Sequence, residues 1–344
     1  MKPYLFDIVV GYGCNFRCKY CFEQNGDTPY ENLAMSPEVL ALACDYARHE
    51  LASIPSDMKM RICFFGGEPL LYTDNINTAM ENLLDTDALF NIVTNGSLIT
   101  QKSDLFQHWK EIVGDRLLVN VSYDYSEQET FRQKGSYETV RNGIRFLMEN
   151  GIPVRTITVV SADNIEKFPE IFVDYQNLQQ EYPSLFGVLN LNYESFASLS
   201  WEDELYPKLR EIEAISPQIQ SSSFRRNDSC GLRGTRFPGN IHGRLHAGVD
   251  VNGDIYPGYS FCFSRDVVKN ACYLGSVYDD FATLDAYRKE LINTLPQYAG
   301  AECMNCTVRC NYSPWHTIHT NINEFNVKPS DTLCKLNAFF RTYL

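Results

Sequence analysis

The chain has 344 residues with a globular composition, 44% hydrophobic and 21% charged, which allows one large domain or two. Its net charge of −13 and the lack of a basic stripe argue against a nucleic-acid partner. No apolar run approaches the ~20 residues that span a bilayer, and the N-terminus is too short and polar for a signal peptide. We therefore expect a soluble, cytoplasmic protein without a membrane partner.

The first two-thirds of the chain alternates strand and helix patterns. Apolar, β-branched runs predict six strands, at 5–10, 60–65, 91–94, 117–122, 154–160 and 188–193. Helical patterns follow each of them, at 36–51, near 75–85, within 101–113, at 136–151, near 164–180 and within 201–215. The helix at 36–51 has Ser36 as its cap, Pro37 at its first position and one apolar face.

This alternation predicts an α/β fold with a parallel sheet buried on both faces. Six β/α units are too few for a closed eight-stranded barrel, so we expect an open, partial (β/α)6 TIM-like barrel. In such barrels the active site forms from the loops at the carboxyl ends of the strands.

The pattern stops near residue 216, where 216–230 is expected to be a Ser-rich linker. Beyond it the chain becomes irregular and rich in Gly and Cys, with short strands around an Asn252-Gly253 turn. We place a domain boundary near 220, which gives a barrel at 1–220 and a small irregular Cys-rich domain at 221–344.

Twelve cysteines are many for a protein of a reducing compartment, where clustered Cys indicate metal or redox ligands rather than disulfides. Ten fall into two groups, at 14–21 and 230–334. Cys44 and Cys63 stand apart between apolar neighbours, so we interpret both as small buried hydrophobic residues.

The first group, Cys14-x-x-x-Cys18-x-x-Cys21, directly follows the first predicted strand. A closed tetrahedral site needs four ligands, and no fourth Cys or His lies nearby. Either a coordination position stays open, or a distant residue completes a structural zinc site.

With Tyr20 before its last Cys, this motif resembles that of radical S-adenosylmethionine (SAM) enzymes. The resemblance implies that Cys14, Cys18 and Cys21 hold three irons of a [4Fe–4S] cluster, while SAM chelates the fourth. The cofactor then carries the radical chemistry and the fold positions it.

Further motifs extend the resemblance, and they lie at or just after the ends of predicted strands. They imply cofactor-binding roles for the GGEP turn (Gly66, Gly67, Glu68, Pro69), for Thr94 and Asn95 of a TNG stretch, and for Tyr20, Ser122 and Asp124. In this interpretation Glu68 contacts the methionine ammonium and Tyr20 packs on adenine. Ser122 and Asp124 reach the ribose and methionine side, and Asp124 is the candidate catalytic residue. From the residues alone, GGEP could be an ordinary turn, Asp124 a solvated carboxylate and Tyr20 a core residue. Tyr125 stands where family members often have Gly.

The second half resembles a SPASM or twitch domain, which carries one or two auxiliary [4Fe–4S] clusters. Seven cysteines match its usual count: Cys230, Cys262, Cys272, Cys303, Cys306, Cys310 and Cys334. Two departures stand out. Gly258 occupies the usual ligand position after the hairpin, and the closing C-x-x-C pair is followed by an unusual spacing. We propose Cys262 as the substitute ligand; the alternatives are one auxiliary cluster only, or zinc. His242, His246, His316 and His319 are interpreted as surface or packing residues.

The resemblance implies an enzyme that cleaves SAM reductively to a 5′-deoxyadenosyl radical, which takes a hydrogen atom from its substrate. The expected substrate is a peptide or protein side chain, modified by crosslinking, epimerisation or oxidation. The alternative is a small carbohydrate-like metabolite. The resemblance also implies an electron donor such as flavodoxin or ferredoxin. Because the first strand begins within five residues of Met1, we expect any leader-peptide recognition domain to be a separate chain. A non-enzymatic iron–sulfur electron carrier would not need GGEP or TNG.

Overall fold

The structure is a computed structural model, which describes residues 3–21, 23, 33–226, 240–241, 244–264, 266–294 and 330–343. Of the predicted ligands, Cys230, Cys303, Cys306 and Cys310 lie outside the described residues, as do His242, His316 and His319.

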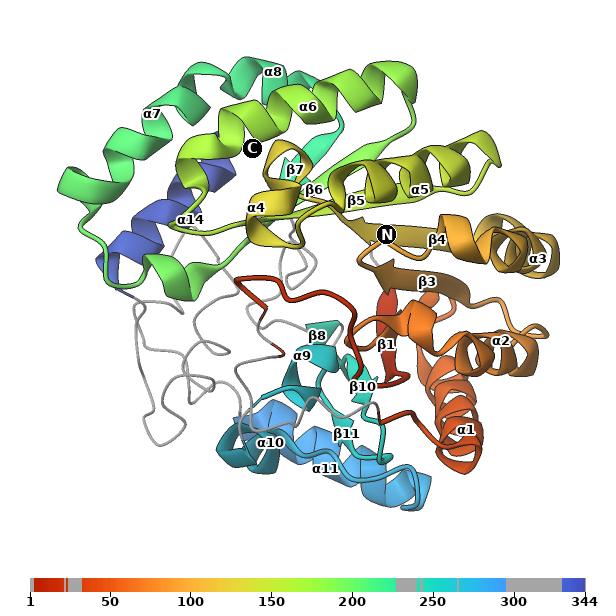
Figure 1. The fold of residues 1–344 in the computed structure, drawn as a ribbon. Helices are drawn as coiled ribbons and strands as arrows, with labels where there is room; N and C mark the ends of the chain where they lie inside the picture. Colours follow the sequence, from red (N-terminus) through yellow and green to blue (C-terminus); the bar gives the residue numbers. More distant parts are fainter. Residues whose placement is uncertain are drawn as a thin grey trace.

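A single curved sheet organises the molecule, with strand order β11-β10-β1-β2-β3-β4-β5-β6-β7 (Figure 1). Neighbouring strands from β1 to β7 all pair in parallel. These strands are β1 (Tyr4–Val9), β2 (Met60–Phe65), β3 (Leu89–Thr94), β4 (Leu117–Ser122), β5 (Val154–Val160), β6 (Phe186–Leu191) and β7 (Phe224–Arg226). Within the described residues β11 and β7 are the edge strands and do not pair with each other, so the sheet forms an open, partial barrel.

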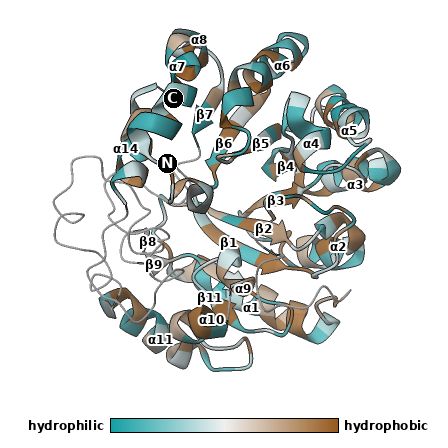
Figure 2. Cartoon of the chain, turned by 60° about the vertical axis from the view of Figure 1, so that its left-hand side comes forward, coloured by the Kyte–Doolittle hydropathy of each residue, from teal (hydrophilic) through white to brown (hydrophobic). Residues whose placement is uncertain are grey.

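Helices cover the outer face of this sheet (Figure 1). They are α1 (Pro37–Ser53), α2 (Thr73–Asn82), α3 (Ser103–Val113), α5 (Tyr137–Glu149), α6 (Phe168–Glu181), α7 (Tyr206–Ala214) and α8 (Ser216–Ser221). Ser36 caps α1 as expected, since its hydroxyl accepts the Val39 N–H at 3.2 Å. Figure 2 shows mostly hydrophobic strands under helices of mixed character, as expected for helices with one face against the sheet. The six predicted strands and the helices after them are confirmed within a few residues.

The prediction of a linker at 216–230 is wrong for residues 216–226. Residues 216–221 form α8, and β7 pairs in parallel with β6 as a seventh barrel strand. Phe224 anchors this strand, because its ring packs 4.9 Å from that of Tyr175 on α6. The Ser-rich composition hid one short strand with a single large apolar anchor. The division at 220 stays a prediction.

The segment after residue 244 joins the other edge of the sheet. β10 (Ala247–Val249) pairs in parallel with β1, and β11 (Ile255–Tyr256) pairs antiparallel with β10. The predicted hairpin is therefore confirmed, and its turn residue Gly253 has a φ of +93°, which favours Gly. The short helix α9 (Tyr259–Cys262), α10 (Asp266–Cys272) and α11 (Phe281–Thr294) follow near this edge, while α14 (Asp331–Tyr343) lies beside α7 (Figure 1).

A separate two-stranded ribbon joins β8 (Asn240–Ile241) to β9 (Arg244–Leu245). Among the helices of the described ranges, none is both long and apolar enough to cross a membrane.

Candidate active site

The cysteine loop, residues 10–21, leaves the carboxyl end of β1 and crosses the barrel (Figure 1, dark red). Cys14, Cys18 and Cys21 are all half-buried on it. The Cys14 Sγ accepts the Phe16 N–H at 3.4 Å, and the Cys21 N–H donates to the Cys18 carbonyl at 3.2 Å. Burial raises the pKa of the Cys14 thiol to about 12, with the Phe16 N–H opposing the shift.

The GGEP turn holds this loop through backbone hydrogen bonds. The Gly67 N–H donates to the Gly11 carbonyl at 3.1 Å, and the Glu68 N–H donates to the Gly13 carbonyl at 2.8 Å. A Cβ on Gly67 would collide with the Tyr12 and Gly13 carbonyl oxygens. The glycines of the turn therefore permit the close approach of two backbone segments, and Pro69 begins the short helix η2 (Pro69–Leu71).

Glu68 connects this turn to the end of β3. Its carboxylate is fully buried and accepts three hydrogen bonds, from the Leu70 N–H at 3.0 Å, the Thr94 hydroxyl at 2.6 Å and the Asn95 N–H at 2.7 Å. Burial raises the pKa of Glu68 to about 7, although these hydrogen bonds oppose the shift. In this structure Glu68 binds its own chain, so a direct contact with a ligand's ammonium stays a prediction.

Two further residues tie the TNG stretch to the cysteine loop. The Asn95 side chain donates to the side-chain amide oxygen of Asn15 at 2.7 Å, and the Asn15 side-chain NH2 donates to the Ser97 hydroxyl at 2.9 Å. Neither Asn15 nor Ser97 was predicted from the sequence. The available signal was a polar Asn between the first two cysteines and a Ser directly after TNG.

Asp124 is fully buried in an ion pair with Arg132, with 3.1 Å between Oδ2 and Nε. Its carboxylate also accepts the Val159 N–H at 3.0 Å and the Tyr20 hydroxyl. The Tyr20 ring stacks on Phe131 at 6.3 Å. The network fastens the last part of the cysteine loop to β4 and β5. It engages both Asp124 oxygens, so its predicted catalytic role stays untested. Arg132 was not predicted.

Ser122 ends β4 and is half-buried. Tyr125, where family members often have Gly, has a φ of +55°, a left-handed conformation that is strained for a residue with a side chain. Its buried hydroxyl bonds that of Thr156 at 2.6 Å, and this packing holds the conformation.

The described cysteines of the second half differ in exposure. Cys262 and Cys272 are buried, whereas Cys334 is half-buried. Asp250 lies near Cys262 and accepts the Tyr12 hydroxyl of the cysteine loop, so the two segments are joined. Burial raises the Cys262 pKa well above its usual range. Cys44 and Cys63 are buried, as predicted.

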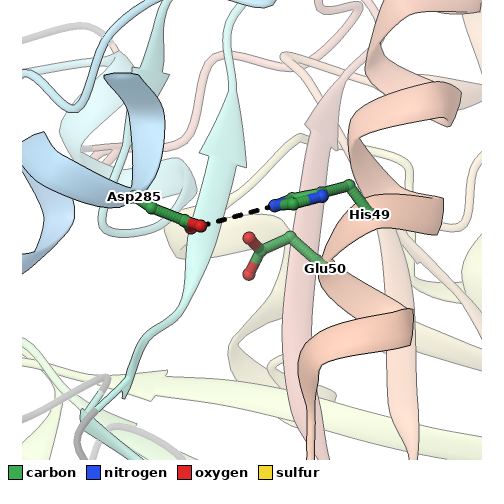
Figure 3. A group of neighbouring side chains, drawn as sticks. All are labelled: His49, Glu50 and Asp285. Atoms are coloured by element: carbon green, nitrogen blue, oxygen red, sulfur yellow. Dashed lines mark ion pairs between the residues drawn. The ribbon is translucent and has the colours of Figure 1, made fainter. Parts of the chain in front are cut away.

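One group of possible cation ligands lies elsewhere in the described ranges. His49 and Glu50 of α1 face Asp285 of α11, with ligand atoms within 4.8 Å of one another (Figure 3). Glu50 already accepts hydrogen bonds from Tyr4 at 2.7 Å and Arg288 at 2.6 Å. Because Arg288 neutralises Glu50, the group joins α11 to α1 and β1 rather than favouring a metal.

His246 is a packing residue, as predicted. It is buried, and its Nδ1 accepts the Leu5 N–H at 2.9 Å. Burial lowers its pKa to about 4, assisted by the charge of Arg288, so the imidazole is neutral at pH 7.

The fold and the loop together define an open parallel α/β barrel with a three-cysteine loop at the carboxyl ends of its strands. Residues 8–174, from β1 into α6, match the family model of the Radical SAM superfamily. The chain therefore contains a Radical SAM domain.

Two curated relatives illustrate the likeness in sequence. The chain is 28% identical over 214 residues to the Radical SAM cyclopropyl synthase TigE of Paramaledivibacter caminithermalis, a match that covers 57% of this chain and 43% of that protein. It is 23% identical over 254 residues to the GTP 3′,8-cyclase of Listeria monocytogenes, covering 67% of this chain and 70% of that protein. The match to the first relative thus spans less than half of its length.

Solved structures of similar fold include anSMEcpe with bound AdoMet. It aligns with a TM-score of 0.73 and 18% identity over 99% of this chain and 96% of that one. A second structure of that protein, with AdoMet and the Cp18Cys peptide, has a TM-score of 0.72 at 18% identity. At this identity the likeness shows the fold alone.

Proposed function

We propose that this protein is a radical SAM enzyme that cleaves SAM reductively and abstracts a hydrogen atom from a peptide or protein side chain. The observation that carries the proposal is the anchored three-cysteine loop at the carboxyl edge of the barrel. Cys14, Cys18 and Cys21 would hold a [4Fe–4S] cluster. When bound and reduced, such a cluster supplies the electron that splits SAM into methionine and a 5′-deoxyadenosyl radical.

The residues present fit such a group. Three half-buried thiols lie on one loop, and the Phe16 N–H already donates to one of them. Without a metal, burial keeps the Cys14 thiol protonated, and ligation would release its proton. Around the loop, the backbone of GGEP and the network of Asn15, Asn95 and Ser97 restrict its motion.

Two comparisons bear on the substrate class. The anSMEcpe structure with a bound peptide shares the fold, which makes a peptide a reasonable first substrate to test. The similarity in sequence to a GTP 3′,8-cyclase supports a small molecule as the alternative substrate. An electron donor such as flavodoxin or ferredoxin, and a separate leader-recognition chain, remain proposed partners.

The decisive experiment measures 5′-deoxyadenosine from the anaerobically reconstituted, reduced protein with SAM. The wild type and a Cys44→Ala control, which lacks only a buried cysteine of α1, should both form it. The variant with Cys14, Cys18 and Cys21 all replaced by Ala should form none. Persistent 5′-deoxyadenosine from that variant would contradict the assignment.

We also propose a SPASM-type second half with one or two auxiliary clusters, in which Cys262 replaces a ligand at Gly258. Three [4Fe–4S] clusters require about twelve irons per chain, and two require about eight. When Cys14, Cys18 and Cys21 are replaced, about eight irons per chain should remain if there are two auxiliary clusters. A lower iron content after the further substitution Cys262→Ala would support a ligand role for Cys262. A remaining content of about four irons per chain that Cys262→Ala does not change would contradict the role of Cys262.

A further inference from the structure

The inner face of the barrel carries a row of polar side chains across its strands. Phe6 of β1 packs 5.5 Å from Tyr46 of α1, so its neighbour Asp7 points to the opposite, inner face. Asp7 pairs in register with Cys63 of β2, and Cys63 with Asn91 of β3. Parallel partners lie on the same face of a sheet, so these three side chains form one row.

Two arginines lie on the same inner face. Arg61 stands two residues before Cys63 on β2, and Arg155 of β5 pairs in register with Asn120 of β4. Both arginines are half-buried, whereas the helix-facing Ile62 and Thr156 beside them are fully buried. The inner face is therefore partly open to solvent at these positions.

Several polar atoms of this region are buried without a hydrogen-bond partner in the described part of the chain. They are Asp7 Oδ1, Asn91 Oδ1 and Arg61 Nε. Other contacts fix the same side chains: Asp7 Oδ2 accepts the Tyr259 N–H at 3.1 Å, and the Asn91 amide donates to the Cys63 Sγ at 3.5 Å. Unsatisfied buried polar groups are uncommon and require an explanation.

Among the described residues the two arginines have no acidic partner, unlike several other arginines of the chain. Arg48 pairs with Asp85, and Arg141 with Asp174. By contrast, the Arg61 guanidinium has no hydrogen bond or ion pair among the described residues. Arg155 donates from Nε to the Asn120 amide oxygen at 2.9 Å, a neutral acceptor.

The charges of these two arginines affect each other. Burial and the charge of Arg61 both lower the pKa of Arg155. Asp7 is the acidic group of the row, but burial raises its pKa to about 7, so it is mostly protonated below that pH. In a chain of net charge −13, two neighbouring cations that have no carboxylate partner in the described part of the chain are suited to an external anion.

We propose that the inner face of the barrel binds an anionic group of the substrate, a carboxylate or a phosphate, between Arg61 and Arg155. This proposal rests on the proposed function, because it names the substrate chemistry of the same barrel. Arg61 stands four residues before Phe65, the last residue of β2, which is about 13 Å along a strand. The anionic group of the substrate would therefore lie deeper in the barrel than the cysteine loop, which follows the carboxyl end of β1.

The test is isothermal titration of the full-length, cluster-reconstituted protein with inorganic phosphate and with glutarate. Saturable binding of either anion by the wild type is expected. Arg61→Gln and Arg155→Gln should each weaken it at least tenfold, and Arg61→Lys should weaken it less, because it keeps the charge. The matched control is Arg48→Gln, which removes a surface arginine, and it should bind like the wild type.

Absence of saturable binding to the wild type, or equal binding by wild type and Arg61→Gln, would overturn the proposal. The unfolding temperatures of all variants show whether a loss of anion binding reflects misfolding. If Arg61→Gln misfolds, the anion affinity of Arg61→Lys is the deciding measurement. Titration with a tetrapeptide that has a free C-terminal carboxylate, and with the same peptide as its C-terminal amide, distinguishes the two sources of the anionic group. Binding of the acid but not of the amide indicates a peptide, and binding of neither indicates a small metabolite. Failure of the proposed function is visible separately, as absence of 5′-deoxyadenosine from the wild type.

Discussion

Replacing Glu68 with Gln tests how the GGEP turn contributes to the site. The carboxylate accepts from the Leu70 and Asn95 N–H groups and from the Thr94 hydroxyl. A Gln side chain has one acceptor oxygen and one NH2 group, so at least one of these donors would face another donor. A buried donor without an acceptor costs about 1–3 kcal/mol. We expect the free energy of unfolding to fall by about that amount and SAM binding to weaken roughly tenfold.

The assay combines chemical denaturation with titration of SAM in the presence of the cluster, and Glu111→Gln on the exposed side of α3 is the control. If Glu68 acts by holding the β3 turn, Thr94→Val should destabilise the Glu68→Gln variant less than the wild type, with a coupling above about 0.5 kcal/mol. If Glu68 acts only by contacting the SAM ammonium, Glu68→Gln lowers the affinity for SAM but leaves the free energy of unfolding unchanged, and the coupling with Thr94→Val is absent. Unchanged stability together with unchanged affinity would refute the reasoning from the buried hydrogen bonds.

Two further predictions concern buried charge. Asp124→Asn should lower the free energy of unfolding by about 3–5 kcal/mol, because Arg132 would remain buried and charged without its partner. Denaturation checks this, with exposed Asp115→Asn as the control, and an equal effect of both substitutions would contradict the prediction. For His246, the folded pKa of about 4 lies below the usual 6.5, so its neutral form stabilises the fold above pH 6.5 and that contribution is lost as pH falls toward 4. Relative to His246→Gln, the wild type should therefore lose up to about 3 kcal/mol between pH 7 and pH 4, and parallel pH profiles would contradict this.

Much of the barrel could be predicted from the sequence because hydrophobic periodicity determines it locally. Residues 60–65, 117–122 and 154–160 form the predicted strands without a shift of boundaries. β7 was missed because three residues with a single anchor, Phe224, give no periodic signal. The parallel pairing of β10 with β1 joins residues about 240 positions apart, and no local pattern encodes it.

The site was predicted unevenly for a related reason. Spacing located the cysteine loop, and position after a strand located Glu68, Thr94 and Asn95, which the structure brings together. A sequence shows which polar residues stand at the edge of a sheet, but not which of them are already hydrogen-bonded.

Glu68 and Asp124 were selected as ligand-binding acids, yet both carboxylates are buried and engaged by their own chain. Arg61 and Arg155 were passed over because they stand inside strands that the sequence predicts as core. Whether they face helices or the inner surface depends on strand pleat and register, and whether they have partners depends on side chains from other strands. A buried polar group that its own chain satisfies explains folding, whereas one that it leaves unsatisfied points to a ligand. On that criterion Arg61, whose Nε has no hydrogen-bond partner among the described residues, is a stronger candidate for substrate contact than the carboxylates after the strands.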